Sequence, residues 1–134
     1  MNNSKYNAHT DPLLKESKLL KIKDIFDVQC MKFWYKFVNQ TVPTYFASMF
    51  RYNHELYDIE TRNHDTLHLD PVRTTSARNI LRHRIPELLL DYPPIILEKV
   101  RTHSIISFAN HVKYHLIDSY RSDCLDPYCY TCTT

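Results

Sequence analysis

The segment between residues 22 and 38, IKDIFDVQCMKFWYKFV, constrains the fold of this chain more than any other. Apolar side chains recur in it at steps of three and four residues, which predicts an amphipathic helix with a broad aromatic stripe. Burial of one large apolar side chain contributes on the order of 2 kcal/mol, so we expect the stripe to form the hydrophobic core, with Cys30 as a small core residue. A ligand-binding aromatic groove is the alternative. The stripe consists of Ile22, Ile25, Phe26, Cys30, Phe33, Trp34 and Phe37.

The chain contains no glycine among its 134 residues. Glycine most readily adopts positive φ at helix ends and in tight turns, and asparagine is the next best residue there. We therefore expect Asn39, Asn53 and Asn63 to take such positions. A Walker phosphate loop, a dinucleotide-binding glycine motif and a nucleophile elbow all require glycine. These classes of enzyme are excluded.

Shorter helices are predicted on both sides of this segment. Thr10 and Asp11 offer capping oxygens ahead of Pro12, which predicts a helix start whose apolar side continues as far as Leu20. One or two helical turns are expected behind Pro43. The segment ARNILRHRIP, residues 77–86, fits a short extended segment, and a helix that ends before Pro86 fits nearly as well.

The second half of the chain also reads as helical. Residues 87–90 and 94–100 each fit one or two turns, and Thr102 is expected to cap a longer helix. The predicted fold is mostly α: a small irregular helical module with a long loop at about 51–72 and a Cys-containing C-terminal tail. The apolar face of the longer helix comprises Ile105, Phe108, Ala109, Val112, Leu116 and Tyr120.

Periodicity disappears between residues 51 and 72, where we expect a long mobile loop. Nothing in the sequence fixes the geometry of His54, His64 and His68, so we expect solvent-facing side chains there rather than metal ligands. The chain then divides into a disordered lead-in, a helical segment with the aromatic stripe, the loop, a basic segment with short helices and the C-terminal amphipathic helix, and a Cys-rich tail. These parts span residues 1–9, 10–50, 51–72, 73–120 and 121–134.

The charge of the chain is close to balanced but unevenly distributed. The formal net charge is +2, yet residues 1–40 carry seven lysines against four acids, and residues 62–84 carry five arginines against two acids. Two such basic patches fit a nucleic-acid-binding face, and an ordinary solvated surface is the competing interpretation.

The sequence has no apolar run of the roughly 18 residues that a membrane-spanning helix needs. Its polar start, MNNSKYNAHT, lacks the pattern of a signal peptide. We therefore expect an intracellular protein, nuclear or cytoplasmic, that has no contact with membranes. In that environment cysteines are reduced thiols or metal ligands rather than disulfides.

Three cysteines near the end of the chain, Cys124, Cys129 and Cys132, have the spacing C-x4-C-x2-C. Two thiolates separated by two residues can share one tetrahedral zinc ion, and His115 or His111 is the candidate for the fourth ligand. Zinc is the only cofactor that the residues suggest. Thiols without a metal, in a frayed tail, are the alternative.

The order of several segments resembles the extreme C-terminal region of reverse-transcriptase polyproteins from non-LTR (LINE-class, jockey-like) retrotransposons. The resemblance covers nearly the whole chain, from about Ala8 to Cys132. The segments that carry it are AHTDPLLKESKLLKIKDIFDVQCMKFWYKF, a Pro-Thr-Tyr-Phe stretch, a Thr-Arg-Asn-His-Asp loop, RHRIPELLLDYPP, THSIISFANHVKYHLIDSY and CLDPYCYTC.

The resemblance implies that the parent protein is an RNA-directed DNA polymerase and that this region follows its polymerase domain. Such polymerases hold two Mg²⁺ ions with paired aspartates, and the chain has no Asp-Asp pair, so we expect no enzymatic activity from it. The expected role is to hold RNA template or target DNA. A helical interaction module that packs on the upstream reverse-transcriptase domain and a decayed relic without function are the alternatives. The residues expected to contact phosphates are Arg62, Arg73, Arg78, Arg82 and Arg84, with Lys15, Lys18 and Lys21 as secondary candidates.

Overall fold

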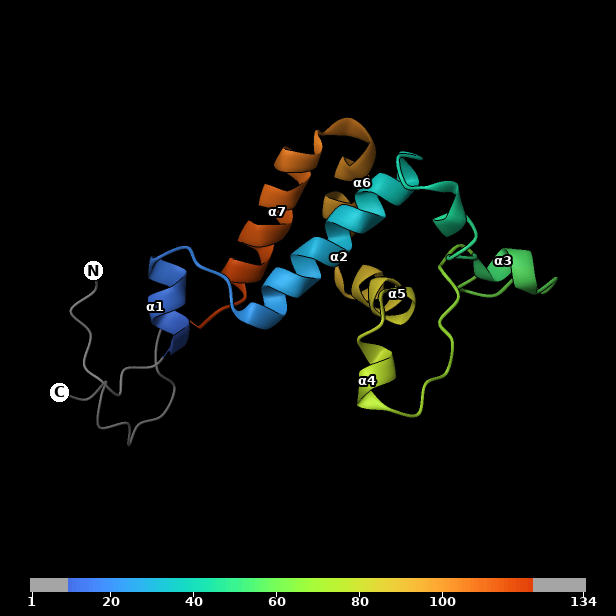
Figure 1. Cartoon of the computed structure of the whole chain (residues 1–134), viewed down its shortest axis with the longest axis horizontal. Helices are drawn as coiled ribbons and strands as arrows, with labels where there is room; N and C mark the ends of the chain where they lie inside the picture. The colour runs from blue at the N-terminus through green and yellow to red at the C-terminus, as the bar shows by residue number, and fades with distance from the viewer. Residues whose placement is uncertain (1–9, 122–134) are drawn as a thin grey trace.

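The computed structural model describes residues 10–121, which fold as a chain of short helices around one long helix (Figure 1). Within these residues no β-strand occurs, and the predicted mostly helical fold is confirmed. The elements are α1 (Thr10–Glu16), α2 (Ile22–Val38), the 3-10 helix η1 (Thr44–Phe46), α3 (Asn53–Leu56), α4 (Thr75–Arg78), α5 (Leu81–Asp91), α6 (Pro94–Thr102) and α7 (Ile105–Asp118). Across the described part of the chain, no helix is both long and apolar enough to cross a membrane.

Helix α2 is the centre of the molecule, since α5, α6 and α7 all pack against it. Figure 1 shows α7 running beside α2, and α6 turning into α7 near one end of α2. We call these four helices the helical body. Its most deeply buried side chains are Met31 on α2, Ile85 on α5, and Phe108 and Val112 on α7. Residues from three separate stretches of sequence therefore share one core.

The predicted aromatic stripe is correct for the second half of α2. Cys30 and Trp34 are buried there, and Phe50 packs on the indole of Trp34 with 5.7 Å between ring centroids. The prediction is wrong for the first turns, where Ile22 is 88% exposed. Ile25 and Phe26 are also exposed. In this part of the helix the side that faces the body carries Asp27 and Val28 instead.

Two helix ends show how the chain turns without glycine. Helix α1 begins at Thr10 as predicted but ends at Glu16, before the predicted apolar side is complete. Lys18 and Gln40 have φ of 54° and 56°, and no other described residue has positive φ. Each lies one position beyond a helix cap, where the Schellman arrangement requires a left-handed residue.

The prediction that asparagines take these positions is wrong. Asn39 is itself the cap residue of α2, with φ −85°, so the left-handed position falls on Gln40. The backbone amide of Gln40 donates to Phe37 and that of Thr41 to Lys36, which satisfies two carbonyls at the helix end. The position in the motif, rather than the type of residue, decides where φ becomes positive.

The segment before Pro86 is mostly helical, so the extended interpretation of residues 77–86 is wrong. Helices α4 and α5 occupy it, and α5 continues through Pro86. Proline removes one backbone hydrogen bond from a helix interior, but the side chain of Pro86 is buried beside Ile85 and Leu88. Packing of this apolar face offsets the lost bond.

The turn between α6 and α7 also differs from prediction. Thr102 is the last residue of α6 rather than a cap, and Ser104 caps α7 by accepting a hydrogen bond from the amide of Ser107 at 3.3 Å. The predicted face of α7 is otherwise correct, because Phe108, Ala109 and Val112 are all buried. Helix α6 begins at Pro94, as predicted.

Candidate nucleic-acid interface

Residues 51–68 form a loop that closes on itself, and we refer to them as the closed loop. Tyr52 and Leu67 form an isolated antiparallel bridge. On either side of it, the amide of Asn53 donates to Thr66 at 2.9 Å and the amide of His68 donates to Arg51 at 2.7 Å. The long loop predicted at about 51–72 is present, but its first part is tied together by backbone hydrogen bonds.

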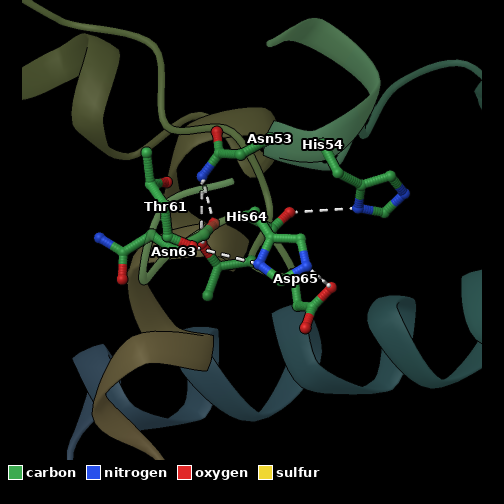
Figure 2. Close-up of polar contacts among 7 residues, drawn as sticks. Asn53, His54, Thr61, Asn63, His64 and Asp65 are labelled. Atoms are coloured by element: carbon green, nitrogen blue, oxygen red, sulfur yellow. Dashed lines mark hydrogen bonds and ion pairs between the residues drawn. The ribbon is translucent and has the colours of Figure 1, made fainter. Parts of the chain in front are cut away.

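The polar side chains of the closed loop bond mostly to its own backbone (Figure 2). The amide group of Asn53 donates to the carbonyl of Asn63 at 2.8 Å, and His54 Nδ1 donates to the carbonyl of His64 at 3.1 Å. His64 Nε2 lies 3.0 Å from the carboxylate of Asp65. These side chains therefore stabilise the turn from within, and His54 and His64 are structural as well as partly exposed.

No metal site is evident in residues 10–121, since no three His, Cys, Asp or Glu side chains there are arranged to hold an ion. The predicted zinc ligands Cys124, Cys129 and Cys132 lie outside the described residues. His115 lies on α7 with its ring 5.3 Å from that of Tyr92. The ring of His111 is 5.3 Å from that of His103, and desolvation lowers the pKa of His111.

A chain of polar contacts joins the closed loop to the start of α5. His68 Nδ1 shares a hydrogen bond with the side-chain oxygen of Asn53 at 3.2 Å, and His68 Nε2 lies 3.1 Å from Asp70. The same carboxylate pairs with Arg82 at 3.2 Å. Asp70 therefore brings the imidazole of His68 and the guanidinium of Arg82 close to each other.

A polar cavity of about 630 Å³ lies beside these contacts, and we call it the polar pocket. Its polar side chains are those of Ser48, Arg51, Tyr57, His68, Asp70 and Arg82. Arg51 and His68 are brought together by the backbone bond between them, and the ring of Tyr57 lies 6.0 Å from that of His68. Neither Arg51 nor Tyr57 is among the residues predicted by name to bind nucleic acid, although both belong to the predicted loop.

The predicted arginines fall into two groups. Arg62, Arg73 and Arg78 are exposed, and the side chain of Arg82 is 65% exposed despite its ion pair. We call Arg73, Arg78 and Arg82 the basic face. Arg73 lies just before α4, Arg78 is the last residue of α4, and Arg82 lies in the first turn of α5. Arg62 lies apart from these, within the closed loop.

Arg84 differs from the other predicted arginines, because most of its side chain is withdrawn from solvent in an ion pair. Its guanidinium donates to both carboxylate oxygens of Asp27, at 2.9 and 2.8 Å, and to Glu87 at 3.1 Å. The Arg84 side chain is 16% exposed and that of Asp27 is 5% exposed. The hydrogen bonds that Arg84 donates to Asp27 raise the pKa of Arg84 well above its usual range. The signal for this pair was Asp27, an acid within an otherwise apolar face.

The predicted lysines lie at the other end of the molecule from the closed loop (Figure 1). Lys21 pairs with Asp11 at 2.8 Å and lies 4.8 Å above the ring of Tyr120. Lys15 donates to the carbonyl of Tyr120 at 3.1 Å. These three contacts tie α1 to Tyr120, just beyond α7, whereas Lys18 is exposed. The lysines therefore do not join the arginines in one surface.

A second cavity, of about 590 Å³, separates the closed loop from α2, α5 and α6. Its lining is mainly apolar and includes Trp34, Leu67, Leu89 and Leu97. Such a lining suits an apolar group, and it offers few polar atoms to orient one.

Comparison with known protein families, curated proteins and solved structures found no match to this chain. Function is therefore argued from the chemistry of the surfaces described above.

Proposed function

We propose that this chain is a non-catalytic nucleic-acid-binding module, the trailing part of a retrotransposon-encoded reverse transcriptase, that holds RNA or DNA. The observation that carries the proposal is the basic face. Residues 71–86 contain four arginines and no acid, and of these arginines only Arg84 is used in the core. The remaining three project from adjacent elements and form the most concentrated positive charge in this half of the chain.

Such a surface binds through phosphates. Each lysine or arginine that neutralises a phosphate releases counterions, so log K falls with log salt by about 0.7 to 0.9 per contact. Thr74, Thr75, Ser76 and Asn79 lie between the arginines and are exposed. Hydroxyl and amide groups of this kind hydrogen-bond to phosphates and sugars without reading sequence. The expected binding is therefore steeply salt-dependent and weakly sequence-specific.

The test is titration of fluorescently labelled RNA and DNA with the full chain at low and high salt. The variant Arg73→Gln/Arg78→Gln/Arg82→Gln should lose most of the affinity and most of the salt dependence. A matched control, Lys23→Gln/Lys36→Gln/Arg101→Gln, removes three exposed charges elsewhere. Wild-type protein that binds neither nucleic acid at low salt, or a control variant that weakens binding as much as the basic-face variant, would overturn the proposal.

A second candidate function rests on a different surface. Ile22, Ile25 and Phe26 share one side of α2 and are 88%, 46% and 41% exposed, and Leu19 nearby is 56% exposed. Apolar side chains gathered in this way commonly mark a protein interface. The partner in this interpretation is the upstream reverse-transcriptase domain.

The two functions are separable by experiment. If the apolar surface is an interface, the isolated chain should self-associate in size-exclusion chromatography, and Ile22→Glu/Phe26→Glu should restore the monomer. The same variant should bind RNA like the wild type. A monomeric wild-type chain that also fails to bind the co-expressed upstream region would exclude the interface.

A further inference from the structure

The polar pocket combines the groups that recognise a nucleotide, and it lies next to the basic face through Arg82. Its walls come from the closed loop, from residues 48–50 before it and Asp70 after it, and from Arg82 at the start of α5. Backbone hydrogen bonds and the His68–Asp70–Arg82 contacts hold those stretches together. A cavity of about 630 Å³ is within the size range of small-molecule sites. The site is therefore large enough for one nucleotide.

The charge of the pocket favours an anion. Arg51 and Arg82 contribute two guanidiniums, and Asp70 contributes the only carboxylate among the lining residues. Asp70 is already paired with both Arg82 and His68, which offsets its charge. Arg51 has no ion-pair partner among residues 10–121. A planar guanidinium with free donors is the group best suited to phosphate oxygens.

The pocket also offers an aromatic ring. Tyr57 is 57% exposed, and its ring lies 6.0 Å from that of His68 and is tilted from it by 56°, so the two rings are not stacked. Unpaired bases stack on exposed tyrosine rings in a sequence-tolerant way. A base within a duplex is already stacked on its neighbours, so this contact favours single strands.

We infer that the polar pocket binds one nucleotide unit of a single strand, with its phosphate on Arg51 and Arg82 and its base stacked on Tyr57. This inference rests on the proposed function, and it adds the strandedness of the ligand and the place where one base is held. The basic face then contacts phosphates farther along the same strand.

The experiment uses a short single-stranded oligonucleotide that carries one 2-aminopurine, whose fluorescence falls when the base stacks. Tyr57→Leu should weaken single-strand binding by roughly 5- to 150-fold, the range expected for one base–aromatic contact, and abolish the fluorescence change. Tyr57→Phe retains the ring and should behave like the wild type. Arg51→Gln should weaken binding by roughly 10-fold, as expected for loss of a charge-assisted hydrogen bond.

Two further arms identify the ligand. Adenosine monophosphate should compete with the labelled strand, whereas inorganic phosphate at the same concentration should not, because it has no base. A duplex of the same sequence should bind more weakly and should be insensitive to Tyr57→Leu. Equal competition by inorganic phosphate would reduce the site to a simple anion site and overturn the inference.

Failure of this inference differs from failure of the proposed function. If the wild type binds no strand, both fail. If the wild type binds and Arg73→Gln/Arg78→Gln weakens binding, but Tyr57→Leu and Arg51→Gln retain wild-type affinity, only the pocket inference fails. Arg51 and Tyr57 are exposed, so unchanged circular dichroism and unchanged melting temperature are expected for both variants. A variant that loses helical signal is replaced by Tyr57→His at that position, which keeps an aromatic ring of smaller area and should bind with intermediate affinity.

Discussion

The helical body and the closed loop are held together by different kinds of interaction. In the body, Met31, Ile85, Phe108 and Val112 are fully buried, so its stability comes mainly from apolar packing. In the closed loop, Leu67 is the only buried residue of the eighteen positions 51–68, and hydrogen bonds to the backbone do most of the joining. Polar, local bonds exposed to water contribute little net stability each.

The helical body therefore provides most of the stability, and the proposed binding groups lie mainly outside it. The groups that we assign to nucleic-acid binding lie on or beside the closed loop, which has little apolar anchoring, whereas the body supplies a rigid support. Binding groups commonly lie on loops that a rigid scaffold positions, and such loops open at lower free energy than the core. We therefore expect substitutions in the body to unfold the protein and substitutions in the closed loop to open it locally.

The largest effect is expected from Asp27→Ala. It leaves the buried guanidinium of Arg84 without its main partner, and removal of one member of a buried ion pair typically costs about 3–5 kcal/mol. The free energy of unfolding, measured by urea denaturation followed by circular dichroism, should fall by that amount. Glu87→Gln is the control, since it removes the more exposed partner and should cost less than about 1 kcal/mol. Equal losses of unfolding free energy in the two variants would show that the Asp27–Arg84 pair stabilises the body no more than an exposed ion pair does.

The next largest effect is expected from Leu67→Ala. Truncation of a buried leucine typically costs about 2–5 kcal/mol, and we expect about 2 kcal/mol because Leu67 lies at the edge of the core. The loss should appear as faster hydrogen exchange of the amides of Asn53 and His68, which bond across the closed loop, with slower amides of α2 unchanged. Leu69→Ala, at a half-exposed neighbour, is the matched control. Equal acceleration in α2 and the loop would mean that the two regions open as one unit.

A smaller effect is expected from Asn53→Ala, which removes three side-chain hydrogen bonds, to Asn63, Thr66 and His68. A net loss of about 1 kcal/mol is expected, which corresponds to roughly five-fold more opening of the loop. Trypsin cleavage after Arg62 should accelerate by this factor. Asn110→Ala, on the exposed side of α7, should leave the cleavage rate unchanged. A cleavage rate equal to that of the wild type would contradict the role given to Asn53.

The smallest effect is expected from alkaline pH, at the junction of α1 and α7. Burial, together with the hydrogen bond that Tyr120 donates to Asp24, raises the pKa of Tyr120 to about 12. Because this pKa is raised above its unfolded value, the stabilisation is complete below about pH 10 and is lost as the pH rises through 12. Unfolding free energies measured across this range should fall less steeply in Tyr120→Phe. Identical pH profiles for the two proteins would mean that this junction does not contribute.

Sequence periodicity predicted the elements that pack mainly by apolar contact. Helices α2 and α7 lie where three- and four-residue steps placed them, and Cys30 is buried as expected. Periodicity did not predict which arginine is withdrawn from solvent, because one specific partner decides this. Nothing local distinguishes Arg84 from Arg82, yet Asp27, which is 57 residues distant, draws one of them into the core.

The candidate site was harder to predict than the helices. The basic stretch identified Arg73, Arg78 and Arg82, which are exposed, because a lack of nearby acids is visible in sequence. Arg51 and Tyr57 reach the polar pocket only because the closed loop brings residues 51 and 68 together. That closure depends on backbone hydrogen bonds, for which this loop has no repeating pattern of side chains.

The ion pair between Asp27 and Arg84 has a consequence for the surface as well as for the core. Successive residues of an α-helix are separated by about 100°, so residues two apart point to nearly opposite sides. With Arg84 locked inward by two bonds to Asp27, Arg82 must point outward, to Asp70 and the polar pocket. The ion pair therefore fixes the rotation of α5 about its own axis. The variant Arg84→Lys would keep the charge but lose the bidentate hydrogen bonding to Asp27. The guanidinium of Arg82 would then no longer be held toward the polar pocket.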